Sequence, residues 1–220
     1  MKGKTKTSAI ILALLAAAFY AINTPFSKVL LENVPPTFLA AFLYLGAGVG
    51  VGIMYLFHIE KEDKSERLTK QDLPYTVGMI LLDIVAPIFL MIGIKMGTAS
   101  NASLLGNFEI VATAIIALIV FKEKISPRLW FGIFFITLSC GMLSFEDVSS
   151  LHFSYGSLFV LLSAICWGFE NNCTRKISSK DPLQIVLLKG IFSGIGSLTI
   201  GLYMGERIAS LWSIFAVLWI

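Results

Sequence analysis

Seven long apolar blocks, separated by short polar segments, run along this sequence. They cover residues 8–31, 37–57, 73–96, 99–121, 127–145, 153–177 and 182–204. Each is long enough to cross the apolar core of a bilayer, which is about 30 Å thick and takes roughly 20 residues of helix. An eighth block begins near Ile208 and reaches Ile220 after about half a crossing. The pattern predicts an all-α, polytopic membrane protein whose eighth span is cut short.

The composition excludes an ordinary soluble domain. Only 14% of the 220 residues are charged, whereas soluble domains carry about 25%. The first block resembles a secretory signal peptide, because basic residues precede an apolar core. Its apolar stretch continues to Leu31 and further blocks follow, so we expect it to be retained as the first span. Cleavage of a signal peptide is the alternative.

Basic residues between the blocks are distributed unevenly. Thirteen of the 17 Lys and Arg residues fall in alternate segments, near residues 2–6, 61–70, 122–128 and 175–180. Cytoplasmic segments of membrane proteins carry such an excess. The sequence therefore predicts a multi-pass protein of the plasma membrane with a cytoplasmic N-terminus.

Several function classes leave no trace in the sequence. It contains no His-Glu-x-x-His motif, P-loop or dinucleotide fingerprint. The three cysteines lie within predicted spans, and the formal net charge of +3 is no nucleic-acid signal. We expect a protein that is not an enzyme, needs no cofactor or metal, and contacts lipid rather than nucleic acid. An intramembrane hydrolase that uses Asp83 and Glu109 as an acid dyad is the enzymatic alternative.

The chain contains a weak internal repeat at an offset of 147 residues. Tyr20, Asn23, Thr24 and Ser27 align with Trp167, Glu170, Asn171 and Thr174. The second copy begins five spans after the first, so the two copies must cross the membrane in opposite directions. This arrangement predicts inverted five-helix repeats, with residues 1–146 as the first repeat and 147–220 as an incomplete second, about seven and a half of ten spans.

The repeated positions form a polar stripe on each helix. Their spacing of i, i+3, i+4 and i+7 places them on one face, and Pro25 is expected to kink the first helix beside them. Inverted-repeat transporters place the substrate between their halves near the midplane. The predicted cavity residues are Tyr20, Asn23, Thr24, Trp167, Glu170 and Asn171. Hydrogen bonding between spans is the alternative role for the hydroxyls and amides.

Two carboxylates lie deep in predicted spans. Asp83 and Glu109 are each about ten residues into a block, which places both near the midplane at about 1.5 Å per residue. A charge at that depth costs about 2.5–3.5 kcal/mol, so both are candidates for proton coupling. The alternative role of the two carboxylates is structural, namely an ion pair with Lys189. Asn107 precedes Glu109 by two residues, and we expect it on nearly the opposite side of a continuous helix.

Glycines recur at intervals of four. The pairs Gly46/Gly50, Gly48/Gly52 and Gly190/Gly194 allow helices to pack closely. They predict close contacts between spans, and a homodimer through the glycine-rich spans is a further prediction.

The segment "TASNASLLGNFEIVATAIIALIVFKEKISPRLWFGIFFITLSCGMLSF" resembles the end of an EamA-type repeat of the drug/metabolite transporter superfamily. Glu109 matches the mid-span Glu of that pattern, and Glu123 matches an acidic residue at the cytoplasmic end. The resemblance implies ten spans in two inverted repeats, a central cavity and transport of small metabolites, often outward. Where the family often has Pro after this Glu, the chain has Ile110, which predicts a straighter helix.

The sequence thus predicts a secondary transporter that moves a small metabolite or drug-like solute by alternating access. Export is the expected direction, with proton coupling as a further prediction. Amino acids, nucleosides and cationic drugs all suit aromatic and amide side chains. The alternative is a non-transporting membrane scaffold, a receptor subunit or an inactive transporter fragment, because about two and a half spans of the family pattern are missing.

Overall fold

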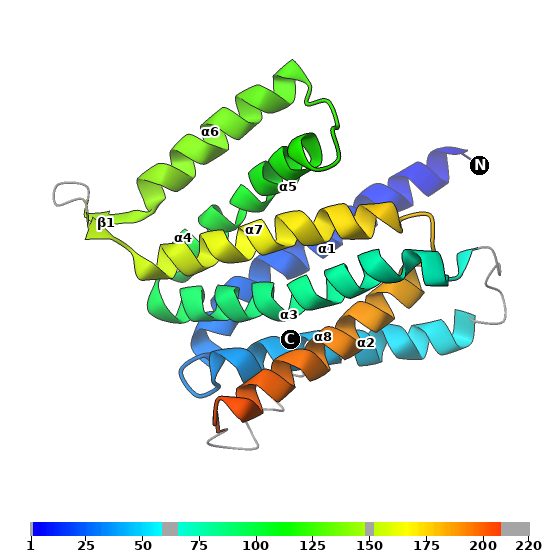
Figure 1. Cartoon of the computed structure of the whole chain (residues 1–220), viewed down its shortest axis with the longest axis horizontal. Helices are drawn as coiled ribbons and strands as arrows, with labels where there is room; N and C mark the ends of the chain where they lie inside the picture. Colours follow the sequence, from blue (N-terminus) through cyan, green and yellow to red (C-terminus); the bar gives the residue numbers. More distant parts are fainter. Residues whose placement is uncertain (1, 59–65, 148–151, 208–220) are drawn as a thin grey trace.

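The computed structural model describes residues 2–58, 66–147 and 152–207. Its helices follow the predicted blocks closely (Figure 1). They are α1 (Lys2–Leu30), α2 (Pro36–His58), α3 (Leu73–Met96), α4 (Ala99–Gly106), α5 (Phe108–Ile119), α6 (Pro127–Leu143), α7 (Tyr155–Lys176) and α8 (Pro182–Tyr203), with a 3-10 turn, η2 (Lys70–Asp72), before α3. The prediction of an all-α, polytopic membrane protein is confirmed. The predicted eighth block lies outside the described residues.

Within the described part of the chain, five stretches are long and apolar enough to cross a membrane, namely Ile10–Leu30, Pro36–Phe57, Lys70–Met96, Ala99–Ile119 and Pro182–Tyr203. The other two predicted spans are less typical. Helix α6 is apolar but has 17 residues, and α7 has 22 residues but carries the polar sequence around Glu170.

The fourth predicted span is not one straight helix, and this corrects the sequence-based expectation. Helix α4 ends at Gly106 and α5 begins at Phe108. The side-chain amide of Asn107 donates to the carbonyls of Ser103 and Leu104, at 3.3 and 3.0 Å. A side chain that competes for backbone carbonyls can interrupt a helix without any proline.

A short hairpin separates α6 from α7. Strands β1 (Phe145–Asp147) and β2 (His152–Phe153) pair antiparallel, with Phe145 opposite Phe153. Only Phe145, the last residue of one predicted block, and Phe153, the first residue of the next, lie in these strands.

The ends of the helices sort into two groups (Figure 1). The start of α1, the α5–α6 connection and the α7–α8 connection lie at one end of the bundle, so α1 and α7 run in opposite directions. An inverted repeat requires this course for its two first helices. We call this end of the molecule the basic end, because it carries Lys122, Lys124, Arg175 and Lys180.

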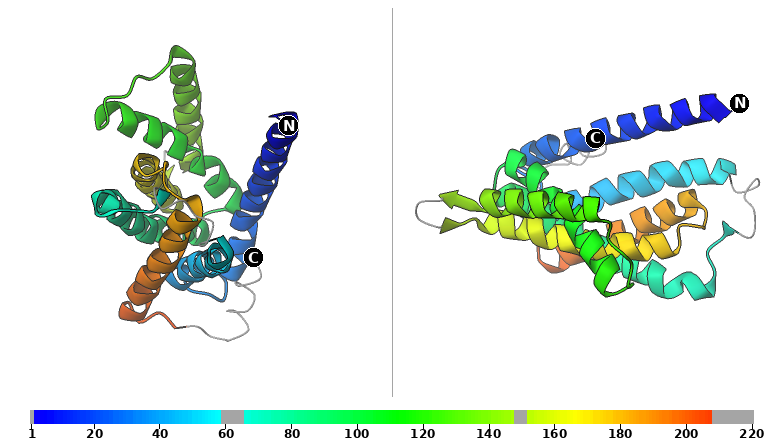
Figure 2. Two further views of the ribbon diagram at one scale, coloured as in Figure 1. Left: turned by 90° about the vertical axis from the view of Figure 1, so that its right-hand side faces the viewer. Right: turned by 90° about the horizontal axis from the view of Figure 1, so that it is seen from above.

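Helix α3 is the centre of the bundle and packs against α7, α8 and α2. Half of its apolar stretch is buried, and Met79, Asp83, Ala86 and Ile94 have no exposed surface. Helix α1 is the opposite case, with only 6% of its apolar stretch buried, and it stands at the edge of the bundle in both views of Figure 2. One firm attachment of α1 is Lys28, whose ammonium donates to the carbonyls of Ile94, Lys95 and Gly97 at 2.7–3.1 Å.

Some of the paired glycines lie in contacts between helices, and others lie on open surface. A Cβ on Gly190 would lie 2.4 Å from the Cα of Gly48, so α2 and α8 touch backbone to backbone there. Gly52 and Gly194 face Leu187 and Leu45 in the same interface. The predicted close packing thus occurs within the chain. Gly46 and Gly50 have nothing within 4 Å of a built Cβ, and a homodimer through glycine-rich spans stays a prediction.

Candidate functional site

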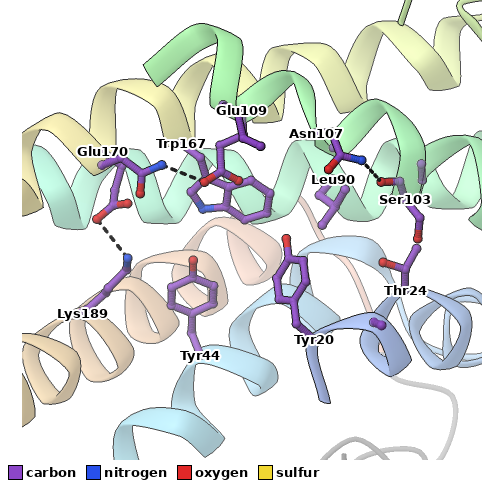
Figure 3. A pocket seen from close by; sticks show the side chains of 15 residues that line it. Tyr20, Thr24, Tyr44, Leu90, Ser103, Asn107, Glu109, Trp167, Glu170 and Lys189 are labelled. Atoms are coloured by element: carbon purple, nitrogen blue, oxygen red, sulfur yellow. Dashed lines mark hydrogen bonds and ion pairs between the residues drawn. The ribbon is translucent and has the colours of Figure 1, made fainter. Parts of the chain in front are cut away.

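A cavity of about 620 Å³ lies among α1, α2, α3, α4, α5, α7 and α8, and we call it the central cavity. Five predicted residues line it, namely Tyr20, Thr24, Trp167, Glu170 and Asn171. Glu109 and Lys189 line it as well (Figure 3). Asn23 lines an adjoining cavity of about 360 Å³, which shares Tyr20, Thr24, Trp167 and Lys189 with the central one. Three residues of each polar stripe, all but Ser27 and Thr174, therefore line these two adjoining cavities.

Lys189 on α8 joins two buried carboxylates. Its Nζ lies 2.9 Å from Oε1 of Glu170 on α7 and 3.1 Å from Oδ2 of Asp83 on α3. Asp83 and Glu170 are 0% and 1% exposed, whereas a quarter of the Lys189 side chain is exposed. One ammonium thus contacts two carboxylates at the meeting point of three helices, and it can neutralise the charge of only one of them.

Asp83 is held from its other side by two neutral donors. The Tyr44 hydroxyl on α2 donates to Oδ1 at 2.8 Å, and the Trp167 indole N–H donates to the same oxygen at 3.2 Å. Asp83 is absent from the cavity lining, whereas its two donors, Tyr44 and Trp167, belong to that lining. A buried carboxylate is stabilised by such donors together with its cation.

Glu109 has a different environment. The side-chain amide of Asn171 donates to its Oε1 at 2.7 Å, and the same nitrogen lies 3.2 Å from the Thr113 hydroxyl. The ion pairs of the described residues include none with Glu109. Asp83 and Glu109 therefore have separate partners, and the hydrogen bonds of the described residues include none between these two carboxylates.

Asn107 corrects a second expectation about the fourth span. It lines the central cavity together with Glu109, although a continuous helix would turn residues two apart to nearly opposite sides (Figure 3). The break between α4 and α5 lies at Asn107 itself, so helical spacing does not extend across it.

Each of the two aligned stripes also contains one internal hydrogen bond between side chains four residues apart. Ser27 donates to Asn23 at 3.0 Å, and Thr174 donates to Glu170, four residues earlier in each helix. The pairs occupy equivalent positions in the proposed repeats. The second copy carries a carboxylate where the first carries an amide.

Sequence reasoning missed several residues of the site, including three that carry polar groups. Tyr44 lines the central cavity and binds Asp83, Ser103 lines the same cavity, and Thr113 contacts Asn171. Tyr44 could have been noticed in the sequence, because it places a polar hydroxyl inside the apolar, glycine-rich second span. The residues that the structure describes contain no cluster of three or more His, Cys, Asp or Glu that could hold a metal.

Comparisons with known proteins agree with this architecture. Residues 7–145 match the model of the EamA-like transporter family. An uncharacterized transporter of Methanothermobacter thermautotrophicus is 25% identical over 203 residues, which are 86% of this chain and 59% of that protein. The uncharacterized transporter YyaM of Bacillus subtilis is 22% identical over 168 residues, 74% of this chain and 55% of that protein.

A solved structure described as "Crystal structure of protein" superposes with a TM-score of 0.60 at 16% identity. The match covers 91% of this chain and 70% of the other, and it establishes similarity of fold. The chain spans less than two thirds of the length of the two curated relatives.

Proposed function

Because the chain belongs to the EamA-like transporter family, we propose that it moves a small metabolite or drug-like solute across the plasma membrane by alternating access. Its two matched relatives carry the name of transporter. The observation that carries the proposal is the central cavity of about 620 Å³, which is lined by charged, amide and aromatic groups inside an apolar bundle. Such groups are costly in a membrane unless they face a cavity or one another.

The cavity chemistry suits a solute with both polar and apolar parts. Tyr20, Trp167 and Leu90 offer apolar surface, whereas Glu109 and Asn171 offer hydrogen-bonding groups. Ligand sites commonly combine a largely apolar wall with a few polar groups that fix orientation. Amino acids, nucleosides and organic cations remain candidate classes.

The transport cycle that we propose uses two inverted repeats, residues 1–146 and 147–220, the second incomplete. The opposite course of α1 and α7 and the matched bonds Ser27–Asn23 and Thr174–Glu170 support this division. The basic end would face the cytoplasm, following the excess of Lys and Arg there. Export is the direction we propose.

Proton coupling is assigned to the two deep carboxylates, with Glu109 in the leading role. Glu109 lines the cavity and has a neutral amide as its partner. Asp83 is bound to Lys189, Tyr44 and Trp167, so its carboxylate is already engaged by other groups of the protein.

Flux measurements on the full chain in liposomes test these proposals. The probes are labelled phenylalanine, uridine and ethidium, with a pH-sensitive dye to follow protons. We expect flux of at least one probe, loss of proton movement after Glu109→Gln with Asp83→Asn, and loss of solute flux after Asn23→Leu with Asn171→Leu. The matched control is Glu32→Gln, which changes an exposed carboxylate outside the cavities.

Absence of flux for every probe class would contradict transport of these solutes. Undiminished proton coupling in the double carboxylate variant would remove the proposed proton role. Retained solute flux in the double asparagine variant would remove the cavity assignment while leaving transport intact.

A further inference from the structure

Another cavity, of about 370 Å³, lies among α5, the start of α6 and α7, and we call it the side cavity. Its walls are largely apolar, and Ala114, Ala117 and Leu129 are among the residues that form them. Its volume falls within the range of about 300–1,000 Å³ that is usual for small-molecule sites. Nothing in the transport proposal above uses this space.

The side cavity and the central cavity share a wall. Glu109, Ile110 and Asn171 line both. The hydrogen bond of 2.7 Å from Asn171 to Glu109 therefore lies where the two cavities meet. Asn171 also contacts the Thr113 hydroxyl at 3.2 Å, and Thr113 lines the side cavity. A polar contact thus lies between two adjacent cavities.

The far end of the side cavity carries charged residues of the basic end. Glu123, Lys124 and Arg175 line it there, and the Arg175 guanidinium forms an ion pair with Glu123. Three charged side chains would be energetically costly in a cavity that contacts only lipid. Its charged end instead indicates contact with water at this face of the membrane.

We infer that the side cavity is a second chamber on the solute pathway, separated from the central cavity by the Glu109–Asn171 hydrogen bond. It takes an amphipathic solute with an apolar body and one hydrogen-bonding end. The apolar end of the solute would pack on Ala114 and Leu129, and its polar end would replace the contact between Asn171 and Glu109. The inference rests on the proposed transport function and assigns this chamber to the basic end.

Thiol accessibility tests the inference without requiring any flux. The native Cys140, Cys166 and Cys173 are replaced by Ala, and Ala114→Cys is introduced in the side-cavity wall. A membrane-impermeant sulfonated maleimide is then added to intact cells or to everted membrane vesicles that contain the full chain. We expect Ala114→Cys to react from the face that carries the basic end and to stay protected from the other face.

Breaking the partition should remove this one-sidedness. With Asn171→Ala, and separately with Glu109→Ala, we expect labelling from the protected face to rise about tenfold or more, the scale set by losing a hydrogen bond to a charged group. The matched control is Asn172→Ala, because Asn172 binds the backbone carbonyls of Thr113 and Gly168 and lines neither cavity. Gel filtration confirms that each variant is folded.

Three results would overturn the inference. Reaction with membrane-permeant N-ethylmaleimide alone would identify a crevice filled by lipid. Equal labelling from both faces in the parent would show that no partition exists. One-sided labelling that survives both partition variants would place the barrier elsewhere. One-sided labelling in a protein that moves no probe would instead refute the transport proposal and leave the partitioned, water-accessible chamber standing.

Discussion

Asp83 and Glu109 are both deep carboxylates, yet the protein balances them differently. Asp83 shares the ammonium of Lys189 with Glu170 and is fully buried. Glu109 is only partly buried and is bonded to a neutral amide. We therefore propose that charge pairing fixes the helices around Lys189, whereas the Glu109 carboxylate takes part in binding a proton or a solute. Similar depth in the sequence therefore does not imply a similar role.

The largest expected effect is on the Lys189 cluster. Lys189→Leu leaves Asp83 and Glu170 buried without their cation, so we expect a loss of about 3–5 kcal/mol in the free energy of unfolding. Thermal unfolding in detergent measures the change. Lys189→Arg is the matched control, because it keeps the charge. Unchanged stability in Lys189→Leu would show that the carboxylates do not depend on this lysine.

Asp83→Asn should have a smaller effect. Lys189 keeps Glu170 as its partner, while the bonds from Tyr44 and Trp167 lose their charged acceptor. We expect a loss of about 1–3 kcal/mol. Combining Asp83→Asn with Lys189→Leu should cost less than the sum of the two single changes, because the residues interact directly. Strict additivity would argue against a functional ion pair.

Thr174→Val tests the support that α7 gives to Glu170. The change removes the hydroxyl that donates to this carboxylate, and we expect a loss of about 0.5–1.5 kcal/mol. Ser27→Ala removes the equivalent donor to Asn23 on α1. Because an amide needs the bond less than a carboxylate does, this control should cost less. Equal losses in the two variants would contradict that difference.

Glu109→Gln should have the smallest effect on stability, within about 0.5 kcal/mol. Its partner is neutral and its side chain borders open space, so no buried cation is left behind. The same variant is expected to abolish most proton-coupled flux. A large loss of stability without any change in flux would reverse the roles assigned to the two carboxylates.

Length and apolarity were enough to predict most of the helices. The block at residues 73–96 coincides with α3 (Leu73–Met96), because Pro74 near its start and Gly97 after its end mark the boundaries. The break at Asn107 was not predictable from hydropathy, since it depends on an amide that turns back to two carbonyls of its own helix. Local spacing predicts faces only while the helix stays continuous.

The sequence predicted individual residues of the candidate site, but it did not predict which of them pair with one another. The stripe around Asn171 was visible from helical spacing, and the sequence marked Asp83, Glu109 and Lys189 as unusual. Which acid pairs with Lys189 depends on α3, α7 and α8 meeting at one point, and that is a property of the packed bundle. Tyr44 was missed because its partner Asp83 lies 39 residues away.

The backbone contact between Gly48 and Gly190 limits how this molecule can move. Gly48 and Gly190 meet through their main chains, and the side chains of Leu45 and Leu187 fill the interface around them, which leaves little space for one helix to slide past the other. We therefore expect α2 and α8 to travel as a single rigid block in any rearrangement. Movement would then occur at α1, which is sparsely buried, and at the break between α4 and α5, which would act as a hinge.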